Sequence, residues 1–432
     1  MAKPHERISR PGRRLISGFL LIILIGGILL ALPFTHRPGA EVSLLDALFI
    51  STSAVCVTGL VPVDIAATFN IAGRTILALL IQLGGLGFAS IAIFFLVLFG
   101  KTIGASQRSL IKEALNAETG RGLVGLVKTV AIGATTIELL GAAALYTVFS
   151  QTYAPLPAIG MSLFHAISAF NNAGFDLLGN FRSLTGYASN LVMNCTIAAL
   201  IILGGLGFFV YRDVLMKRRW KKFTMHSKIV LSMTLALIVV GMLLFMITSG
   251  LPPLEAFFQS VSARTAGFNT VDMTSLGTAG LLVMIILMFI GASPGSTGGG
   301  IKTTTMFTLL VMMFSVSTRR QPTAFQRRIT MESITKALVV VTMAFSVVLI
   351  GTLGICMVEG ERFPLSYVLF ESVSAFATVG LSCGITPDLQ SGSKLLLMLM
   401  MFIGRLGPLT IASSIRFKDQ QLSYIEEKIL IG

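Results

Sequence analysis

The sequence predicts an all-α polytopic membrane protein, and three observations predict it. Of its 432 residues, 54% are hydrophobic and only 12% are charged, about half the charged share of a soluble protein. Apolar runs that could cross a hydrocarbon core of about 30 Å recur, among them 15–32, 75–99 and 191–210. A helix–short helix–helix unit also recurs four times. We therefore expect eight spans and four re-entrant helices, arranged with pseudo-fourfold symmetry around one axis.

The repeated unit is recognised by a segment that begins Ser-Ala and ends with Gly before Leu or Phe. The four segments are SAVCVTGL (53–60), SAFNNAGF (168–175), SARTAGF (262–268) and SAFATVGL (374–381). Each follows a semi-apolar run of about ten to twelve residues, too short to span and suited to a re-entrant helix. Each is followed by a spanning run with a glycine near its middle, at Gly84, Gly204, Gly291 and Gly404.

These units divide the chain into nine segments. The expected boundaries are an N-terminus 1–14, unit 1 at 15–100, a connection 101–121, unit 2 at 122–212, a basic connection 213–227, unit 3 at 228–318, a connection 319–330, unit 4 at 331–416 and a tail 417–432. The first apolar run is too long for a cleaved signal peptide and has no small-residue cleavage site.

The net charge of +14 is distributed as a topology signal. Lys and Arg concentrate in five segments, bounded by Lys3 and Arg14, Lys101 and Lys128, Arg212 and Lys228, Arg319 and Lys336, and Arg416 and Lys428. The intervening loops carry few basic residues, which is the positive-inside pattern and places both termini in the cytoplasm. Nucleic-acid binding is not indicated. A docking surface for a cytoplasmic partner is the lesser alternative, strongest for KRRWKK at 217–222.

Two kinds of chemical site are not indicated. The four cysteines have no CxxC spacing and the four histidines do not cluster with them, so we expect neither disulfides nor a zinc site. The stretch Gly295 to Thr303 is similar to the phosphate-binding pattern GxxxxGK[ST], but Ile301 separates Gly300 from Lys302. We therefore expect no bound nucleotide on this chain.

The four glycine turns predict a path for a cation. Non-helical backbone at membrane depth is tolerated only where protein buries it or where it lines a water-filled path. Glycine allows carbonyl oxygens to point inward, and rings of carbonyls can replace the hydration shell of a monovalent cation. An acidic residue after each turn would concentrate cations at the outer mouth; these are Asp64, Asp176, Asp272 and Asp388. The alternative is that they are ordinary loop carboxylates or helix caps.

The four-unit pattern with VCVTGL, FNNAGF, ARTAGFNTVD and ATVGL resembles the Trk/Ktr/HKT superfamily of potassium transporters over nearly the whole chain. Because only about fourteen residues precede the first span, it is most similar to the membrane (pore) subunit of the bacterial Ktr system. The resemblance implies potassium uptake (K⁺ transported, with Na⁺ a stimulating or coupled ion), and no enzymatic activity. It also implies a homodimer in the bacterial inner membrane, a cytoplasmic ring of nucleotide-binding regulatory subunits, and a tail, 424–432, at the dimer interface.

The resemblance assigns a selectivity filter of three residues in each unit. These are Val57, Thr58 and Gly59; Asn172, Ala173 and Gly174; Thr265, Ala266 and Gly267; and Thr378, Val379 and Gly380. In the superfamily a serine at the first glycine position goes with sodium selectivity, so Gly59 favours potassium. The filter is less uniform than the TVGYG of potassium channels, and a sodium-selective or poorly selective transporter of the same family remains the alternative.

The last helix of the third unit is broken by GASPGSTGGGIKTTT, residues 291–305. The other units have no comparable run, so we expect a gating loop that crosses the axis below the filter, as the resemblance also implies. Its residues are Gly291, Ala292, Ser293, Pro294, Gly295, Ser296, Thr297, Gly298, Gly299, Gly300 and Lys302. The alternative is a Pro/Gly kink accommodated by close helix packing.

Arg405 occupies the matching depth in the fourth unit. An arginine inside a membrane is costly and is by default a candidate functional residue. Its charge would repel a cation in the cavity, and its guanidinium could donate hydrogen bonds to the gating loop. The alternative is an ion pair with Glu138 or Glu371.

Two other classes of protein fit the sequence less well. A secondary transporter of a small anionic substrate would use the broken helix to present positive helix ends, but that class usually has inverted repeats, and these repeats are parallel. A membrane enzyme would need paired carboxylates, a Ser/His pair or a metal cluster at one depth, and the sequence offers none.

Overall fold

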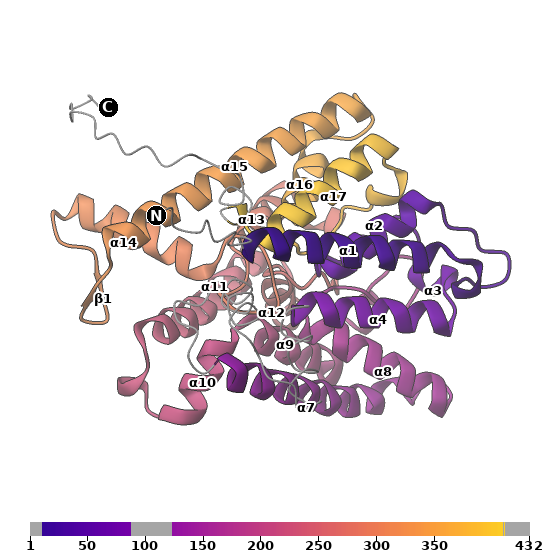
Figure 1. Ribbon diagram of the computed structural model, residues 1–432, viewed down its shortest axis with the longest axis horizontal. Coiled ribbons are helices and arrows are strands. Elements are labelled where there is room, and N and C mark those ends of the chain that lie inside the picture. The colour runs from indigo at the N-terminus through magenta and orange to yellow at the C-terminus, as the bar shows by residue number, and fades with distance from the viewer. Residues whose placement is uncertain (1–10, 88–122, 409, 411–432) are drawn as a thin grey trace, which may run out of the picture.

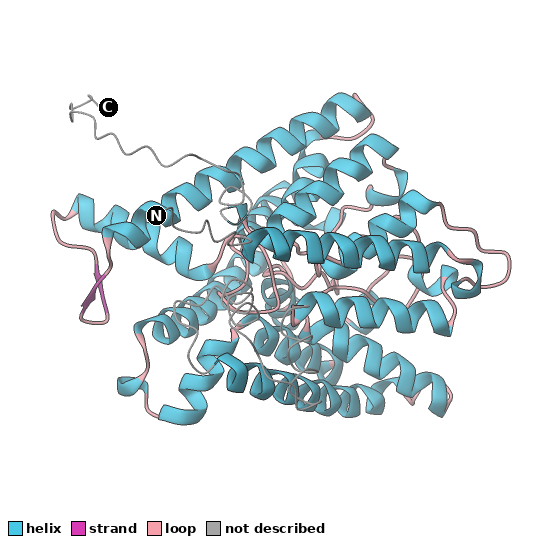
Figure 2. Cartoon of the chain, viewed as in Figure 1, coloured by secondary structure: helices cyan, strands magenta, loops and turns pink. Residues whose placement is uncertain are grey.

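The computed structural model describes residues 11–87, 123–408 and 410. Residues 1–10, the connection 101–121 and the tail 417–432 lie outside the described residues. The described chain is largely helical, with one small antiparallel hairpin of β1 (Thr323–Ala324) and β2 (Arg327–Arg328) (Figure 2). Its main helices lie roughly side by side (Figure 1).

Each expected unit contains a long first helix, a short second helix and a third helix. They are α1 (Pro11–Ala31), α2 (Leu44–Val55) and α4 (Ile71–Gly85); α7 (Leu123–Phe149), α8 (Pro155–Phe170) and α9 (Leu191–Gly205); α11 (Met225–Ser249), α12 (Pro253–Ser262) and α13 (Gly277–Phe289); and α15 (Met331–Glu359), α16 (Leu365–Ala377) and α17 (Ser391–Leu406). Between them lie α3 (Ile65–Thr68), α10 (Phe208–Lys217), α14 (Thr303–Ser317), and the 3₁₀ turns η1 (Pro33–Thr35), η2 (Thr185–Tyr187), η3 (Trp220–Lys222), η4 (Met273–Leu276) and η5 (Thr386–Asp388).

The units contact one another in a closed order. The third helix of each unit packs against the short helix of the next: α4 on α8, α9 on α12, and α13 on α16. The last unit returns to the first, because α17 packs on α2. The short helices are therefore enclosed by third helices from neighbouring units.

The four first helices are the ones long and apolar enough to cross a membrane within the described chain: Arg13–Ala31, Lys128–Phe149, Met225–Ser249 and Met331–Glu359. No more than two fifths of the most apolar window in each is buried in the protein. Large apolar side chains such as Leu139, Leu243 and Ile350 are exposed on them. A hydrocarbon surrounding accounts for these faces.

The third helices are shorter than the sequence predicts. They have 13 to 16 residues; those of units 1, 2 and 4 end where the sequence predicts a continuous span, and that of unit 3 ends just before the predicted break at 291–305. Glycines with positive φ follow three of them, at Gly87 (φ +78°), Gly207 (φ +89°) and Gly407 (φ +84°). After the break at Gly207, α10 runs at 94° to α9. Helix ends followed by a left-handed glycine, a backbone that only glycine adopts without strain, thus occur in the three units for which no break was predicted.

Glycine also permits close packing on the short helices. The glycines expected near the middle of a span lie in the last turn of the third helix in units 1, 2 and 4. A Cβ on each would lie less than 2.5 Å from a carbonyl oxygen near the end of a short helix. The pairs are Gly84 with Val55 O (2.2 Å), Gly204 with Phe170 O (1.8 Å) and Gly404 with Phe376 O (1.7 Å). Gly84 and Gly204 both stand in the sequence LGGLGF, at 83–88 and 203–208, so this motif provides a surface of small residues for close packing.

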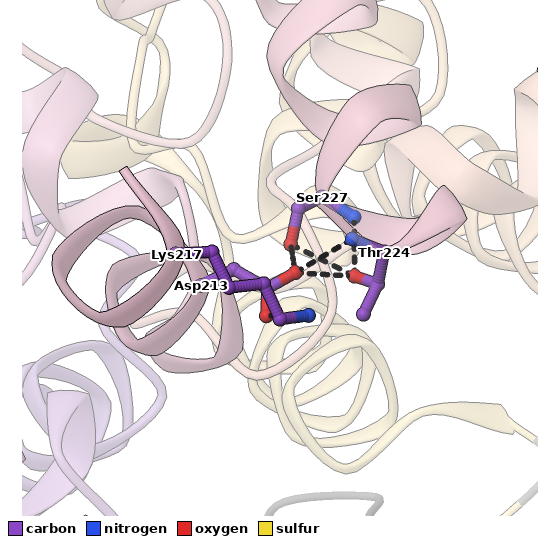
Figure 3. A network of polar contacts seen from close by, with 4 residues as sticks. All are labelled: Asp213, Lys217, Thr224 and Ser227. Atoms are coloured by element: carbon purple, nitrogen blue, oxygen red, sulfur yellow. Dashed lines mark hydrogen bonds and ion pairs between the residues drawn. The ribbon is translucent and has the colours of Figure 1, made fainter. Parts of the chain in front are cut away.

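Asp213 stabilises the connection between the second and third units through hydrogen bonds and an ion pair (Figure 3). Its Oδ2 accepts hydrogen bonds from Thr224 N (2.9 Å), Thr224 Oγ1 (2.6 Å) and Ser227 Oγ (2.8 Å), and its Oδ1 pairs with Lys217 Nζ at 2.7 Å. Burial by itself would raise the pKa of Asp213, but the hydrogen bonds from Lys217, Thr224 and Ser227 outweigh it and hold the pKa well below the usual range. The carboxylate therefore ties the end of α10 to the start of α11.

Replacing Gly404 with alanine should destabilise the fold. The added methyl has no room beside Phe376 O, so we expect the free energy of unfolding to fall by about 1–3 kcal/mol. Gly160→Ala is the matched control, because a Cβ there meets nothing within 4 Å, and it should stabilise α8 by up to about 1 kcal/mol. Thermal unfolding of both variants in detergent checks this; equal melting temperatures would contradict it.

Asp213→Asn should lower the free energy of unfolding by about 1–3 kcal/mol at pH 7, because charged hydrogen bonds are lost. Since folding lowers the pKa of Asp213, its contribution is complete above the unfolded pKa of about 4 and is lost as pH falls below it. The difference in melting temperature between wild type and variant should therefore shrink from pH 6 to pH 3. Glu332→Gln is the control, because its pair with Lys336 is exposed. A difference independent of pH would contradict this assignment.

Candidate functional site

The four glycine turns meet and form a ring, which we call the glycine ring: Gly59, Gly174, Gly267 and Gly380. A Cβ on each would contact the carbonyl oxygen before the next glycine. The pairs are Gly59 with Ala173 O (2.4 Å), Gly174 with Ala266 O (2.7 Å), Gly267 with Val379 O (2.4 Å) and Gly380 with Thr58 O (2.0 Å). The structure thus brings together all four predicted triplets in the order of the units.

Each turn has the same unusual backbone. The ring glycines have positive φ, at +99°, +70°, +80° and +92° in chain order. The residue two positions earlier also has positive φ: Val57 (+58°), Asn172 (+57°), Thr265 (+80°) and Thr378 (+52°). Positive φ in a β-branched residue costs about 1–3 kcal/mol and persists only where the surroundings impose it. Three of these four are β-branched, so the turn geometry is maintained against local preference.

Serines of the Ser-Ala pairs contact the turns from behind. Ser53 Oγ accepts from Gly59 N at 2.9 Å, and Ser374 Oγ accepts from Gly380 N at 3.0 Å. In the third unit Ser262 Oγ donates to Phe268 O. These contacts give the serine a role in units 1, 3 and 4, whereas Ser168 Oγ of the second unit is buried without a hydrogen-bond partner.

A cavity of about 560 Å³ opens on one side of the glycine ring, and all four ring glycines line it. Asp176 and Asp272 also line it, while Asp64 lies in a smaller adjoining pocket with Gly59. Asp388 lines neither of these pockets. Asp64 and Asp272 are also helix caps, accepting from Ala66 N (2.8 Å) and Thr274 N (2.9 Å). Asp272 therefore both caps a helix and lines the cavity, so the cap and outer-mouth interpretations are compatible there.

The 291–305 segment contacts the turn residues from their other flank. Gly299 N donates to Thr378 Oγ1 at 3.0 Å, and a Cβ on Gly298 would lie 2.2 Å from Thr265 Oγ1. Toward the second unit, Ser293 N donates to Gly205 O at 3.1 Å and Thr297 Oγ1 to Phe170 O at 3.2 Å. The segment is therefore more than a kink in one helix, because it binds elements of three units.

Arg405 and Lys302 hold the main chain of this segment. Arg405 donates to Thr297 O and Gly84 O, and to Gly85 O at 3.1 Å. Lys302 Nζ donates to Gly298 O at 2.7 Å and Gly299 O at 3.3 Å. The guanidinium thus joins the fourth unit to the first unit and to the 291–305 segment.

Neither carboxylate proposed as an alternative partner binds Arg405. Glu138 accepts from Gln82 Nε2 (3.2 Å) and Asn171 Nδ2 (3.1 Å), forming a buried polar cluster that joins α4, α7 and the end of α8. Glu371 accepts from hydroxyls that follow the fourth turn. The ion-pair alternative is wrong for this structure. The cluster around Glu138 was missed because its amide members carry no charge and lie far apart in sequence.

A family model described as "TrkH: Cation transport protein" matches residues 22–424. The chain belongs to this family. The predicted resemblance is confirmed, and the family is one of cation transporters rather than enzymes. The potassium/sodium uptake protein NtpJ of Enterococcus hirae is 41% identical over 448 residues, covering 99% of this chain and 98% of that protein. The Ktr system potassium uptake protein B of Bacillus subtilis is 38% identical, covering 98% and 97%.

Among solved structures, the crystal structure of the potassium transporter TrkH from Vibrio parahaemolyticus matches this TrkH-family chain with a TM-score of 0.72. The match covers 96% of this chain and 87% of that one, at 19% sequence identity. At this identity the likeness concerns the fold, which is shared over nearly the whole chain.

Arg405→Gln should loosen the 291–305 segment, because the carbonyls of Thr297, Gly84 and Gly85 lose charged donors. We expect backbone amides of 291–302 to exchange hydrogen at least about tenfold faster, corresponding to the loss of about 1.5–3 kcal/mol. The control is Lys394→Gln, which removes an ion pair with Asp46 elsewhere in the protein. Hydrogen–deuterium exchange in nanodiscs measures both; similar protection in wild type and R405Q would show that Arg405 does not hold the segment.

Proposed function

We propose that this chain is the ion-translocating subunit of a Ktr-like potassium uptake system. The observation that carries the proposal is the glycine ring, in which four turns of identical backbone handedness place carbonyl oxygens beside one another. Carbonyl rings suit a dehydrated monovalent cation. The ring opens on a cavity with two carboxylates, which raise the local concentration of cations. The twelve filter residues are those of the four turns.

The proposed architecture is pseudo-fourfold, with eight membrane passes and the pore on the axis. The closed order of helix contacts supports it. Each third helix, together with the chain after its break, makes one pass. The basic connections lie in the cytoplasm, and the cavity beside Asp176 and Asp272 faces outward. The nine segment boundaries follow from this topology.

Gating is assigned to the 291–305 segment. Its glycines contact Thr265 and Thr378 of the filter on the flank away from the outer cavity, so in this conformation it closes the path. Arg405 holds it closed through Thr297 O and places a positive charge below the filter. Opening requires these contacts to break.

Potassium is the preferred ion because the first ring position is Gly59. The second candidate is a sodium-selective or poorly selective transporter, which the potassium/sodium uptake name of the NtpJ relative favours. A secondary transporter of small anions is set aside, since the family is one of cation transporters.

The proposed assembly is a homodimer on a cytoplasmic ring of regulatory subunits. The names of the relatives as components of a Ktr system support partners of this kind. The regulatory nucleotide would bind the ring, with none on this chain. We also propose that the protein lies in a bacterial inner membrane, that sodium stimulates uptake, and that uptake occurs by symport.

The test is ion flux into proteoliposomes that hold only this protein, under potassium, rubidium or sodium gradients. Potassium and rubidium flux should exceed sodium flux. Deletion of residues 292–300 should raise the potassium flux and the rubidium flux about tenfold or more, because the obstruction is removed. Sodium flux above potassium flux would favour the second candidate. Absence of cation flux from both folded proteins would contradict the proposed function.

Gly59→Ser should shift selectivity toward sodium. Its Cβ would lie 2.4 Å from Ala173 O, and φ is +99°, so the ring must rearrange. We expect the sodium-to-potassium flux ratio to rise by about tenfold or more, since each 1.4 kcal/mol of differential binding is tenfold. Gly39→Ser is the control, because it has positive φ (+81°) but nothing within 4 Å. Equal sodium-to-potassium flux ratios in G59S and G39S would show that Gly59 does not determine the selectivity.

A further inference from the structure

In three of the four short helices, a buried side chain at the same position contacts the backbone that follows the ring glycine, although the three residues are of different types. Three positions before the Ser-Ala serine, they carry His165 in α8, Gln259 in α12 and Glu371 in α16. Each side chain is at least 99% buried. His165 and Gln259 accept a hydrogen bond from the backbone N–H three residues after the ring glycine of their own unit, which is the amide of Leu177 or Thr270. In the fourth unit the equivalent amide, that of Cys383, stabilises the carboxylate of Glu371.

His165 makes the contact through one ring nitrogen. Its Nδ1 lies 2.8 Å from Met161 O, which can only accept, so Nδ1 carries the hydrogen. Nε2 is then free to accept from Leu177 N at 3.4 Å. The rings of Phe149 and Phe268 lie 5.1 Å and 6.4 Å away, centroid to centroid, and enclose the imidazole. The histidine therefore acts as a neutral acceptor.

Gln259 and Glu371 make the contact with an oxygen. With its amide oriented to face the donors, Gln259 accepts from Thr270 N at 3.0 Å and Val271 N at 3.2 Å. Glu371 accepts from Ser382 Oγ and from Thr386 Oγ1 at 3.2 Å, and the amide of Cys383 stabilises its carboxylate. Thr270 and Cys383 line the outer cavity, so both contacts lie directly behind its wall.

The first unit departs from this pattern at both ends of the contact. The position of the acceptor is occupied by Ile50, and the position of the donor, three residues after Gly59, is Pro62, which has no N–H. Acceptor and donor are therefore missing together. Such a paired absence is expected if the side chain serves to satisfy the rim amide at this position.

We propose that His165, Gln259 and Glu371 are positioning residues that hold the outer rim of the filter, with Pro62 replacing the contact in unit 1. The inference rests on the proposed function. These side chains contact the rim from the side away from the ion path, so they act through the backbone. Without the acceptor, a buried N–H loses its partner and the segment between the ring glycine and that amide is free to shift. The carbonyl positions of the ring then become less selective.

The test compares Glu371→Leu with Glu371→Gln, and Gln259→Leu with Gln259→Glu. Leucine is close in size but has no acceptor, whereas the conservative variants keep an oxygen for the rim amide. Ile50→Leu is the matched control at the same position of the unit that lacks the contact. Hydrogen exchange of 381–387 and 268–273 is measured in nanodiscs. Sodium and potassium flux, and the KM for potassium, are measured in proteoliposomes.

Each leucine variant should speed exchange of its own rim segment about tenfold and raise the sodium-to-potassium flux ratio about two- to tenfold, matching the loss of one hydrogen bond. The KM for potassium should rise more than the maximal flux falls. The Gln and Glu variants should stay within about twofold of wild type, as should Ile50→Leu.

Unchanged exchange and unchanged flux ratio in both leucine variants would overturn the proposal, as would equal effects from Ile50→Leu, which would indicate general packing. If E371L does not fold, Gln259→Leu decides by the same readouts in the third unit. If wild type moves no cation, the proposed function fails, while the exchange of the rim segments still decides whether the acceptors hold them.

Discussion

The whole arrangement depends on one constraint: backbone that is not helical inside a membrane must find hydrogen-bond partners within the protein. The glycine turns and the 291–305 segment contain most of this backbone. Serines such as Ser53 and Ser374 satisfy amides of the turns, and Arg405 and Lys302 satisfy carbonyls of the segment. These four polar side chains therefore lie where the backbone is not helical and needs other hydrogen-bond partners. The four-unit order follows from the same need, since each third helix covers the short helix of its neighbour.

Close approach of the backbone is the second recurring element. Glycines in the last turn of the third helices allow these helices to touch carbonyls near the ends of the short helices, and ring glycines allow the turns to touch one another. The 291–305 segment and the first glycine turn are connected through α4. Arg405 donates hydrogen bonds to Gly84 O and Gly85 O, and Gly84 itself packs on Val55 O. A single guanidinium thus connects the segment below the ring with the helix that supports the first turn.

The sequence predicted the repeat, the four turns and the break at 291–305, because the signals were local: Ser-Ala, a glycine at fixed spacing, and a cluster of breaking residues. It did not predict the breaks after Gly85, Gly205 and Leu406, because LGGLGF is as apolar as a continuous span and the sign of φ at Gly87 or Gly207 is set by tertiary packing. The partner of Arg405 was left open for the same reason, since carbonyls leave no mark in a sequence. His165, Gln259 and Glu371 were missed because a shared position with different residue types gives no motif.

The four units lie on one chain, and this has a consequence for how the ring can change. In an assembly of four identical subunits, one substitution alters every quarter of the ring at once. Here one level of the turns already has three residue types, in Val57, Asn172, Thr265 and Thr378, and the level behind it has four, in Ile50, His165, Gln259 and Glu371. Each quarter can change separately while the other three keep their geometry. Under the proposed function, a preference between two ions can therefore be adjusted in small steps, whereas a symmetric tetramer must accept large ones.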